Sequence, residues 1–241
     1  MTLLLLAGAG EARRLAWDLV PRGTKVIASF GRPDRQPDPF PVPHRVGGFG
    51  GAEGFEAFLD EAGITAILDV THPFAAHISA RTQMICAGRG LPYLAYVRPP
   101  WTPVDGDLWT EIGSEAEAAH HIAPGSCVFV GTGRGTLEAY APLEGCRILV
   151  RLLDPPTGPF PFPGGEFLIG RPPFPADRER ALFAALGVDV LVVRNAGGAA
   201  SATKLEAARD LGLPVLMIRR PPPPEPHVSR IGDVLDWVDA L

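Results

Sequence analysis

The chain has 241 residues, of which 46% are hydrophobic and 20% are charged, and its formal net charge at pH 7 is −5. This composition excludes an intrinsically disordered chain, and the length suits one large α/β domain or two small ones. Because an acidic chain binds phosphate backbones poorly, we expect no nucleic-acid partner.

In the first hundred residues, short apolar runs alternate with helix-like segments. The apolar runs are typical of parallel strands covered on both faces, and they lie at residues 3–7, 25–30, 65–70 and 93–97. Helices are predicted between them at residues 11–21, 52–62 and 74–89. This alternation predicts a doubly wound parallel sheet, and we assign residues 1–100 to an NADP(H)-binding, Rossmann-like domain.

The proline-rich stretch 98–103 reads as an extended crossing, after which a second α/β series begins. Its strands are expected near residues 108–112, 126–131, 146–152, 166–169, 189–194 and 214–218, and its helices near 114–122, 135–142, 175–187 and 202–212. After four prolines at 221–224, apolar residues at helical spacing predict a last helix at 230–240 that packs back on the body. We therefore expect an α/β protein with two Rossmann-like parallel-sheet domains, 1–100 and 101–241, and a substrate cleft between them.

The first strand ends in a glycine-rich turn, Gly8-Ala9-Gly10-Glu11-Ala12. Such a turn lets backbone N–H groups and a helix N-terminus meet a pyrophosphate, so we expect Gly8, Gly10, Glu11 and Ala12 to bind a dinucleotide. The match to GxGxxG is partial because Arg13 occupies the third glycine position. A tight turn without a ligand is the alternative.

The end of the second strand indicates which dinucleotide. NAD-binding domains place an acidic residue there, whereas this chain has Ser29-Phe30-Gly31-Arg32. We expect Ser29 and Arg32 to hold the 2′-phosphate of NADPH; the alternative is that Arg32 is one of many surface arginines. The glycine-rich stretch Gly47–Gly51 is predicted to bring its backbone close to the cofactor through Gly47, Gly48 and Gly50, although a plain flexible loop remains open.

Thr71 and His72 follow the third strand, at the edge where open parallel sheets bind ligands. Pro73 suits the first turn of the next helix. We take Thr71, His72 and Lys204 as candidate catalytic residues; Lys204 is one of only two lysines, the other being Lys25. A capping histidine and a solvent-facing lysine are the structural alternatives.

In the second half, Gly131-Thr132-Gly133-Arg134 and Asn195 also follow predicted strands. Arginines recur at these strand ends, namely Arg98, Arg134, Arg151, Arg194, Arg219 and Arg220. Because arginine binds carboxylates through two parallel hydrogen bonds, a small polyanion is the expected substrate class. We select Arg98, Gly131, Thr132, Arg134 and Asn195 as substrate-binding residues.

Metal and disulfide chemistry are not indicated. The cysteines Cys86, Cys127 and Cys146 form no CxxC motif, and His72 and His77 are not at metal-ligand spacing. The apolar run at the start of the chain is too short for a signal segment or a membrane span. We expect a cytoplasmic protein without a membrane partner; the sequence does not fix the oligomeric state, and a monomer is our expectation.

Several of these stretches together resemble the precorrin-6A reductase family of cobalamin biosynthesis. The most specific part is the string Thr71-His72-Pro73-Phe74-Ala75 followed by Arg98-Pro99-Pro100-Trp101. The other matching stretches are residues 8–12, 29–32, 47–51, 131–134 and 195–204.

The resemblance implies that NADPH reduces one carbon–carbon double bond of a corrin precursor, converting precorrin-6A to precorrin-6B or acting on the cobalt-containing analogue. It implies a tetrapyrrole substrate that is rich in acetate and propionate carboxylates. Thr71, His72 and Lys204 would orient or protonate this macrocycle. Two alternatives remain: an NADP-dependent reductase of another small polyanion, and a non-enzymatic NADP(H) sensor.

Overall fold

In a computed structural model, residues 1–31, 40–153, 155–156, 158–171 and 173–241 are described, and the chain divides into two compact units. The first unit comprises Met1–Pro99 and Pro221–Leu241, and the second comprises Pro100–Arg220. The C-terminal segment therefore belongs to the first unit, whereas we expected residues 101–241 to form one domain.

The first unit contains a six-stranded parallel sheet in the order β12-β5-β4-β1-β2-β3. Its strands are β1 (Thr2–Ala7), β2 (Lys25–Phe30), β3 (His44–Val46), β4 (Ala66–Val70), β5 (Tyr93–Tyr96) and β12 (His227–Val228). The chain leaves β1 toward β2 on one side and later returns to β4 on the other. The carboxyl ends of β1 and β4 therefore flank the switch point at which open α/β sheets bind ligands.

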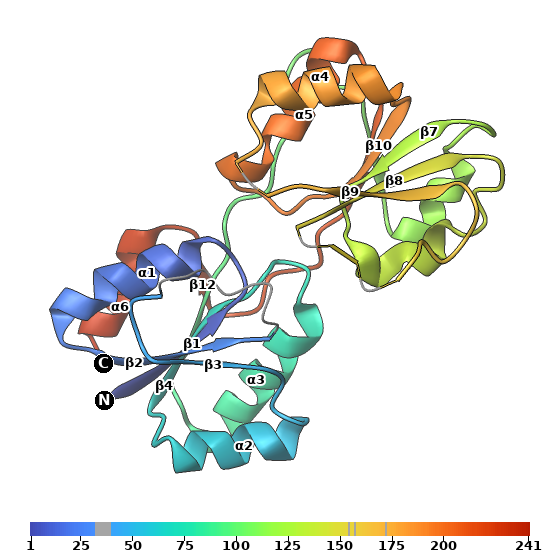
Figure 1. The fold of residues 1–241 in the computed structure, drawn as a ribbon. Helices are drawn as coiled ribbons and strands as arrows, with labels where there is room; N and C mark the ends of the chain where they lie inside the picture. Colours follow the sequence, from blue (N-terminus) through green and yellow to red (C-terminus); the bar gives the residue numbers. More distant parts are fainter. Residues whose placement is uncertain (32–39, 154, 157, 172) are drawn as a thin grey trace. The chain divides into compact units, whose positions relative to one another are not determined.

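Helices cover both faces of this sheet (Figure 1). Helix α1 (Glu11–Leu19) packs beside α6 (Ile231–Asp239) on one face, and α2 (Ala52–Glu61) lies beside α3 (Ala76–Arg89) on the other. Leu3 and Leu5 point toward α1 and α6, and Leu4 and Leu6 point toward α2 and α3, so every residue of β1 is buried. Each such leucine contributes about 1.5–3 kcal/mol to folding, which explains the continuous apolar run.

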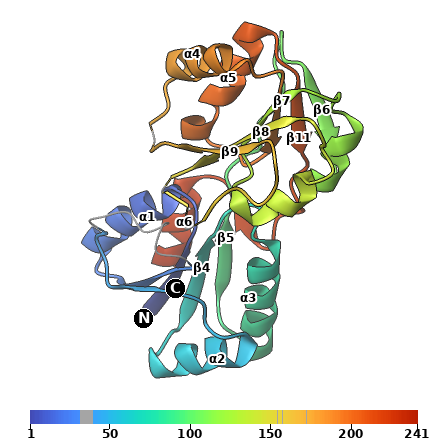
Figure 2. The ribbon, with the colours of Figure 1, turned by 45° about the vertical axis from the view of Figure 1, so that its right-hand side comes forward.

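The second unit has its own six-stranded parallel sheet, in the order β6-β11-β10-β7-β8-β9. Its strands are β6 (Trp109–Ile112), β7 (Cys127–Val130), β8 (Arg147–Leu152), β9 (Gly165–Ile169), β10 (Val190–Arg194) and β11 (Val215–Ile218). One face carries α4 (Ala176–Leu186) and α5 (Thr203–Leu211), as Figure 2 shows. The other face carries the 3₁₀ helices η3 (Glu115–His120) and η4 (Arg134–Tyr140) (Figures 1 and 2).

The two sheets share one strand order, position by position, with β7 in the place of β1 and β10 in the place of β4. The edge position filled by β12 in the first sheet is filled in the second by β6, which comes first in its unit. The turns after the central strands match as well. The Gly8 amide donates to the Val70 carbonyl at 3.1 Å, and the Gly131 amide donates to the Val192 carbonyl at 2.9 Å.

These observations confirm the predicted pair of Rossmann-like parallel-sheet domains and correct several details. The short edge strands β3 and β12 were not predicted, and the helices expected at 114–122 and 135–142 are 3₁₀ helices. Helix α3 begins at Ala76, so Pro73 lies in the turn before the helix and not in its first turn. Two further short 3₁₀ helices are η1 (Val20–Arg22) and η5 (Ala199–Ser201). In the part of the chain that the structure describes, no helix is long and apolar enough to span a membrane.

Candidate active site

Gly8 lies where the turn after β1 meets the loop after β4. The amides of Gly8 and Ala9 both donate to the Val70 carbonyl, at 3.1 and 2.9 Å. A Cβ at Gly8 would lie 3.0 Å from the His72 amide nitrogen and 3.1 Å from the Thr71 Cα. The structure thus brings Gly8, Thr71 and His72 together, and Gly8 has a packing reason to lack a side chain.

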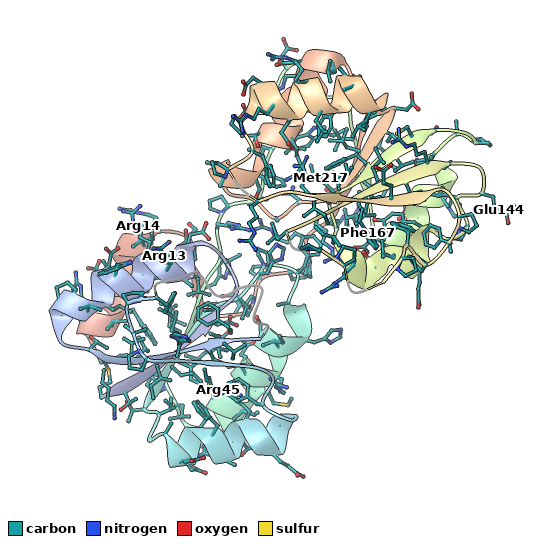
Figure 3. All side chains as sticks on the ribbon, in the orientation of Figure 1. Arg13, Arg14, Arg45, Glu144, Phe167 and Met217 are labelled. Atoms are coloured by element: carbon teal, nitrogen blue, oxygen red, sulfur yellow. The ribbon has the colours of Figure 1, made fainter. Side chains whose placement is uncertain are left out.

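Gly10 has different surroundings at the start of α1. A Cβ at this position would meet no atom within 4 Å, and no side chain caps the helix. Uncapped amides in a first helical turn favour an anion. Glu11, in that turn, is neutralised by Arg98, whose Nη1 lies 3.1 Å from its Oε2. Ala12 packs on the sheet, whereas Arg13 projects from α1 into solvent, so its side chain does not obstruct helix packing (Figure 3).

Ser29 is the last but one residue of β2 and is held by an arginine that was not singled out from the sequence. Arg45, opposite Ser29 in the neighbouring β3, donates from Nη1 to the Ser29 hydroxyl and the Gly47 carbonyl, both at 2.9 Å. It also donates from Nη2 to the Gly48 carbonyl at 2.9 Å. Its side chain lies between β3 and α2, with its guanidinium 4.0 Å from the centre of the Phe49 ring (Figure 3). The signal that could have found Arg45 is its place directly before the glycine-rich stretch.

The glycines of this stretch lie beside open space. A Cβ at Gly47, Gly48 or Gly50 would meet no atom within 4 Å. Gly47 and Gly50 have φ values of 116° and 79°, which strongly favour glycine. Arg45 thus brings Ser29, Gly47 and Gly48 together, whereas Arg32 lies outside the described residues.

Thr71 is tied to a buried polar network beneath the loop. The Asp69 carboxylate, 2% exposed, accepts the Thr71 amide at 3.0 Å and the Tyr93 hydroxyl at 2.9 Å. The Thr71 hydroxyl lies 3.2 Å from the Ser79 hydroxyl. Burial, together with the Asp69 charge, raises the pKa of Tyr93 far above its ordinary range, so the hydroxyl stays a donor. Asp69 and Tyr93 were not expected from the sequence, since nothing local marks strand residues as a hydrogen-bonded pair.

His72 has an oriented ring. Its Nδ1 accepts the backbone N–H of Phe74 at 3.3 Å, and the His72 carbonyl accepts the Ala75 amide at 2.7 Å. Because Nδ1 accepts a hydrogen bond, the neutral ring carries its proton on Nε2. The loop therefore presents a ring of defined tautomer beside the turn after β1.

In the second unit, Asn195 and Lys204 meet around Trp101. The Asn195 side chain accepts the Trp101 amide at 2.8 Å and donates to the Trp101 carbonyl at 2.9 Å. Lys204 Nζ lies 5.4 Å from the centre of the Trp101 ring and donates to the Ser201 carbonyl at 2.6 Å. A Cβ on Gly131 would lie 3.9 Å from the Lys204 Cε. The carboxyl edge of the second sheet thus holds Gly131, Asn195 and Lys204 close together.

Thr132 and Arg134 extend from the same edge in different ways. The Thr132 hydroxyl lies 2.9 Å from that of Thr136 and 3.0 Å from that of the buried Tyr140. Burial raises the pKa of Tyr140 above its ordinary range. Arg134 is exposed, and its side chain makes no hydrogen bond or ion pair with any residue that the structure describes.

Most strand-end arginines bind the chain's own glutamates, which was not expected from the sequence. Their nitrogen–oxygen distances are 3.1 Å for Arg98–Glu11, 2.7 Å for Arg151–Glu179, 2.5 Å for Arg194–Glu115 and 2.7 Å for Arg219–Glu111. The guanidinium groups of Arg98, Arg151 and Arg194 are partly buried and therefore require an anion, whereas the Arg219–Glu111 pair lies at the surface. Among the residues that the structure describes, no group of three or more His, Cys, Asp or Glu side chains could hold a metal ion.

Comparison with known proteins identifies relatives along nearly the whole chain. The family model described as "Precorrin-6x reductase CbiJ/CobK" matches residues 2–239. A precorrin-6A reductase of Rhodococcus erythropolis is 40% identical over 246 residues, covering 99% of this chain and 98% of that protein. One of Rhodobacter capsulatus is 38% identical over 239 residues, covering 98% and 95%. A cobalt-precorrin-6A reductase of Priestia megaterium is 30% identical over 232 residues, covering 91% and 90%.

A solved structure, titled "CobK precorrin-6A reductase", matches with a TM-score of 0.91 and 37% sequence identity, covering 100% of this chain and 96% of that one. Sequence and fold thus agree over both units. The chain belongs to the precorrin-6x reductase CbiJ/CobK family of oxidoreductases.

Proposed function

We propose that this chain reduces one carbon–carbon double bond of precorrin-6A to give precorrin-6B, with NADPH as the hydride donor. The carrying observation is the strand order of the first unit, whose switch point between β1 and β4 holds a glycine turn and the Thr71–His72 loop. Relatives named for precorrin-6A reduction, 36–40% identical over almost the entire chain, support the substrate.

The residues of the first unit fit NADPH. The uncapped start of α1 and the open space at Gly10 suit a diphosphate, and the Glu11 charge that would oppose it is neutralised by Arg98. The described end of β2 offers the Ser29 hydroxyl and not a carboxylate. We assign the cofactor to Gly8, Gly10, Glu11, Ala12, Ser29, Arg32, Gly47, Gly48 and Gly50. NADPH, when bound, supplies the hydride.

Reduction of a conjugated double bond also requires a proton on the atom beside the carbon that receives hydride. Because Nδ1 accepts the Phe74 amide, the neutral His72 ring can donate a hydrogen bond from Nε2 and so orient the macrocycle. To give up a proton, the ring would first take a second proton on Nδ1 in place of the Phe74 hydrogen bond. Thr71 can orient the acceptor through its hydroxyl, which the Ser79 hydroxyl positions. Lys204 offers an ammonium group as the alternative donor, at the edge of the second sheet.

The second unit is assigned to the carboxylates of the macrocycle. Arg134 and Thr132 supply a cation and a hydroxyl beside Gly131. In the first unit, Arg98, which also pairs with Glu11, is assigned to a further carboxylate of the substrate. Asn195 contributes by holding the backbone of Trp101. Cobalt-containing substrates are less favoured, because relatives named for cobalt-precorrin-6A are 24–30% identical.

The proposal is tested by titrating the purified protein with NADPH and NADH and then adding precorrin-6A while absorbance is recorded. NADPH-selective binding and oxidation with a shift of the macrocycle spectrum are expected. Arg32→Ala should raise the KM for NADPH much more than that for NADH.

Other outcomes would contradict the proposal in distinct ways. Turnover of only the cobalt-containing analogue would exclude precorrin-6A as substrate. Turnover of a different small polyanion without tetrapyrrole binding would exclude the corrin pathway. Tight NADPH binding without oxidation in the presence of any tetrapyrrole would point to a non-enzymatic sensor.

A further inference from the structure

Arg45 is a fixed, partly buried cation in β3, beside the carboxyl end of β2. Three of its guanidinium N–H groups are used by the Ser29 hydroxyl and the Gly47 and Gly48 carbonyls, each at 2.9 Å. One face of the guanidinium is covered by the Phe49 ring at 4.0 Å, and the Phe58 ring lies at 5.3 Å. The Nε proton and one Nη2 proton make no hydrogen bond with any residue that the structure describes.

The charge of Arg45 is not balanced by the chain in the way that other arginine charges are. The partly buried Arg98, Arg151 and Arg194 each contact a glutamate within 3.1 Å. Arg45 has no carboxylate within ion-pair distance among the described residues, and its three bonded acceptors are neutral. Burial alone lowers the pKa of Arg45 from its ordinary value, which is the effect of desolvating a cation without a nearby anion.

The position of Arg45 indicates which anion completes the site. In dinucleotide-binding sheets the residue at the end of β2 meets the 2′ position of the adenosine ribose. Ser29 is the last but one residue of β2, and Arg45 lies opposite it in β3 and donates to its hydroxyl. Free Nε–H and Nη2–H groups can bind two oxygens of one phosphate.

We infer that Arg45 is a specificity-determining residue that binds the 2′-phosphate of NADPH, with its guanidinium held in place by Phe49, Ser29 and the Gly47–Gly48 carbonyls. This inference rests on the proposed function and adds the residue that separates NADPH from NADH. The glycine-rich stretch then has a defined role, since its carbonyls orient the guanidinium that receives the phosphate.

The test measures binding of four ligands to the full chain by calorimetry: NADPH, NADH, adenosine 2′,5′-bisphosphate and ADP. The variants are Arg45→Gln, which removes the charge, and Arg45→Lys, which keeps a charge without the planar fork. Arg89→Gln is the matched control, because Arg89 ends α3 and pairs with Asp60, far in the chain from β2 and β3. Thermal melting of each variant establishes that it is folded.

Wild-type protein should bind adenosine 2′,5′-bisphosphate more tightly than ADP. Arg45→Gln should weaken the binding of NADPH and of the bisphosphate by at least about 10-fold, or about 1.4 kcal/mol. The affinities for NADH and ADP should change by less than about 2-fold. Arg45→Lys should keep part of the preference for the 2′-phosphate, and Arg89→Gln should keep all of it.

An equal loss of affinity for all four ligands in both Arg45 variants would overturn the inference, because it would show that Arg45 only shapes the loop. Unchanged NADPH binding in Arg45→Gln would overturn it as well. In both cases the wild-type protein still prefers NADPH, so the proposed function stands. A wild-type protein that does not distinguish NADPH from NADH overturns both the inference and the cofactor assignment.

Discussion

Gly8 and Gly10 belong to the same turn, yet the structure assigns them different reasons to be glycine. Gly8 faces the backbone of Thr71 and His72, whereas Gly10 faces open space. Gly8→Ala should therefore destabilise the fold, whereas Gly10→Ala should leave the fold intact and weaken the binding of NADPH. This pair of substitutions separates packing from ligand binding within one motif.

The expected magnitude follows from the distances. A Cβ at Gly8 would lie 3.0 Å from the His72 nitrogen and 3.1 Å from the Thr71 Cα, and both are backbone atoms that cannot rotate away. Because the Val70 carbonyl holds the turn through two amides, relief requires moving hydrogen-bonded backbone. Overpacking of this kind costs about 1–3 kcal/mol. Gly10 has φ −60° and ψ −27°, which alanine adopts freely, so Gly10→Ala should cost nothing or stabilise by up to about 1 kcal/mol.

Urea denaturation of both variants measures the free energy of unfolding, and NADPH titration measures binding. Gly8→Ala should lower the urea midpoint. Gly10→Ala should keep the midpoint and weaken NADPH binding, because its methyl group enters the space before α1. The reasoning would be refuted by a Gly8→Ala protein as stable as wild type. A Gly10→Ala protein that loses stability but binds NADPH normally would refute it equally.

Three further predictions concern the buried networks. Tyr93→Phe should lower the free energy of unfolding by about 1–3 kcal/mol in urea, since Asp69 loses its donor; an unchanged midpoint would contradict the network. Burial raises the pKa of Cys86 from 9.0 to about 11. The protonated thiol therefore contributes fully to the free energy of unfolding below pH 9, and this contribution is lost as the pH rises to 11. The urea midpoint should therefore decrease less between pH 8 and pH 10.5 in Cys86→Ala than in wild type. An equal decrease in both proteins would show that this thiol is not the cause. Asn195→Ala should destabilise the second unit and change tryptophan emission, because both backbone groups of Trp101 lose their partners; Asn195→Asp, which keeps the acceptor for the Trp101 amide, should have a smaller effect.

The candidate site could be predicted in outline but not in its contacts. The glycine turn, Thr71 and His72 were selected because they follow apolar runs, and Ser29 because it lies near the end of one, since parallel strands end at one edge of a sheet. Their roles stay predictions. Arg45 was missed, since its importance depends on β3 lying beside β2. The pairing of Arg98, Arg151, Arg194 and Arg219 with distant glutamates was not expected either, and substrate binding by Arg98 stays a prediction.

The sequence alone determined the class of the fold. Strands such as β1 are buried on both faces, so nearly every residue must be apolar, and this demand is local and visible. The tertiary structure alone decided which segments join each sheet. β12 and α6 come last in the chain and complete the first unit, and β6 takes the equivalent edge position in the second. The edge strands β3 and β12, of three and two residues, bury little surface, so hydrogen bonds to a neighbour in space, and not an apolar pattern, define them.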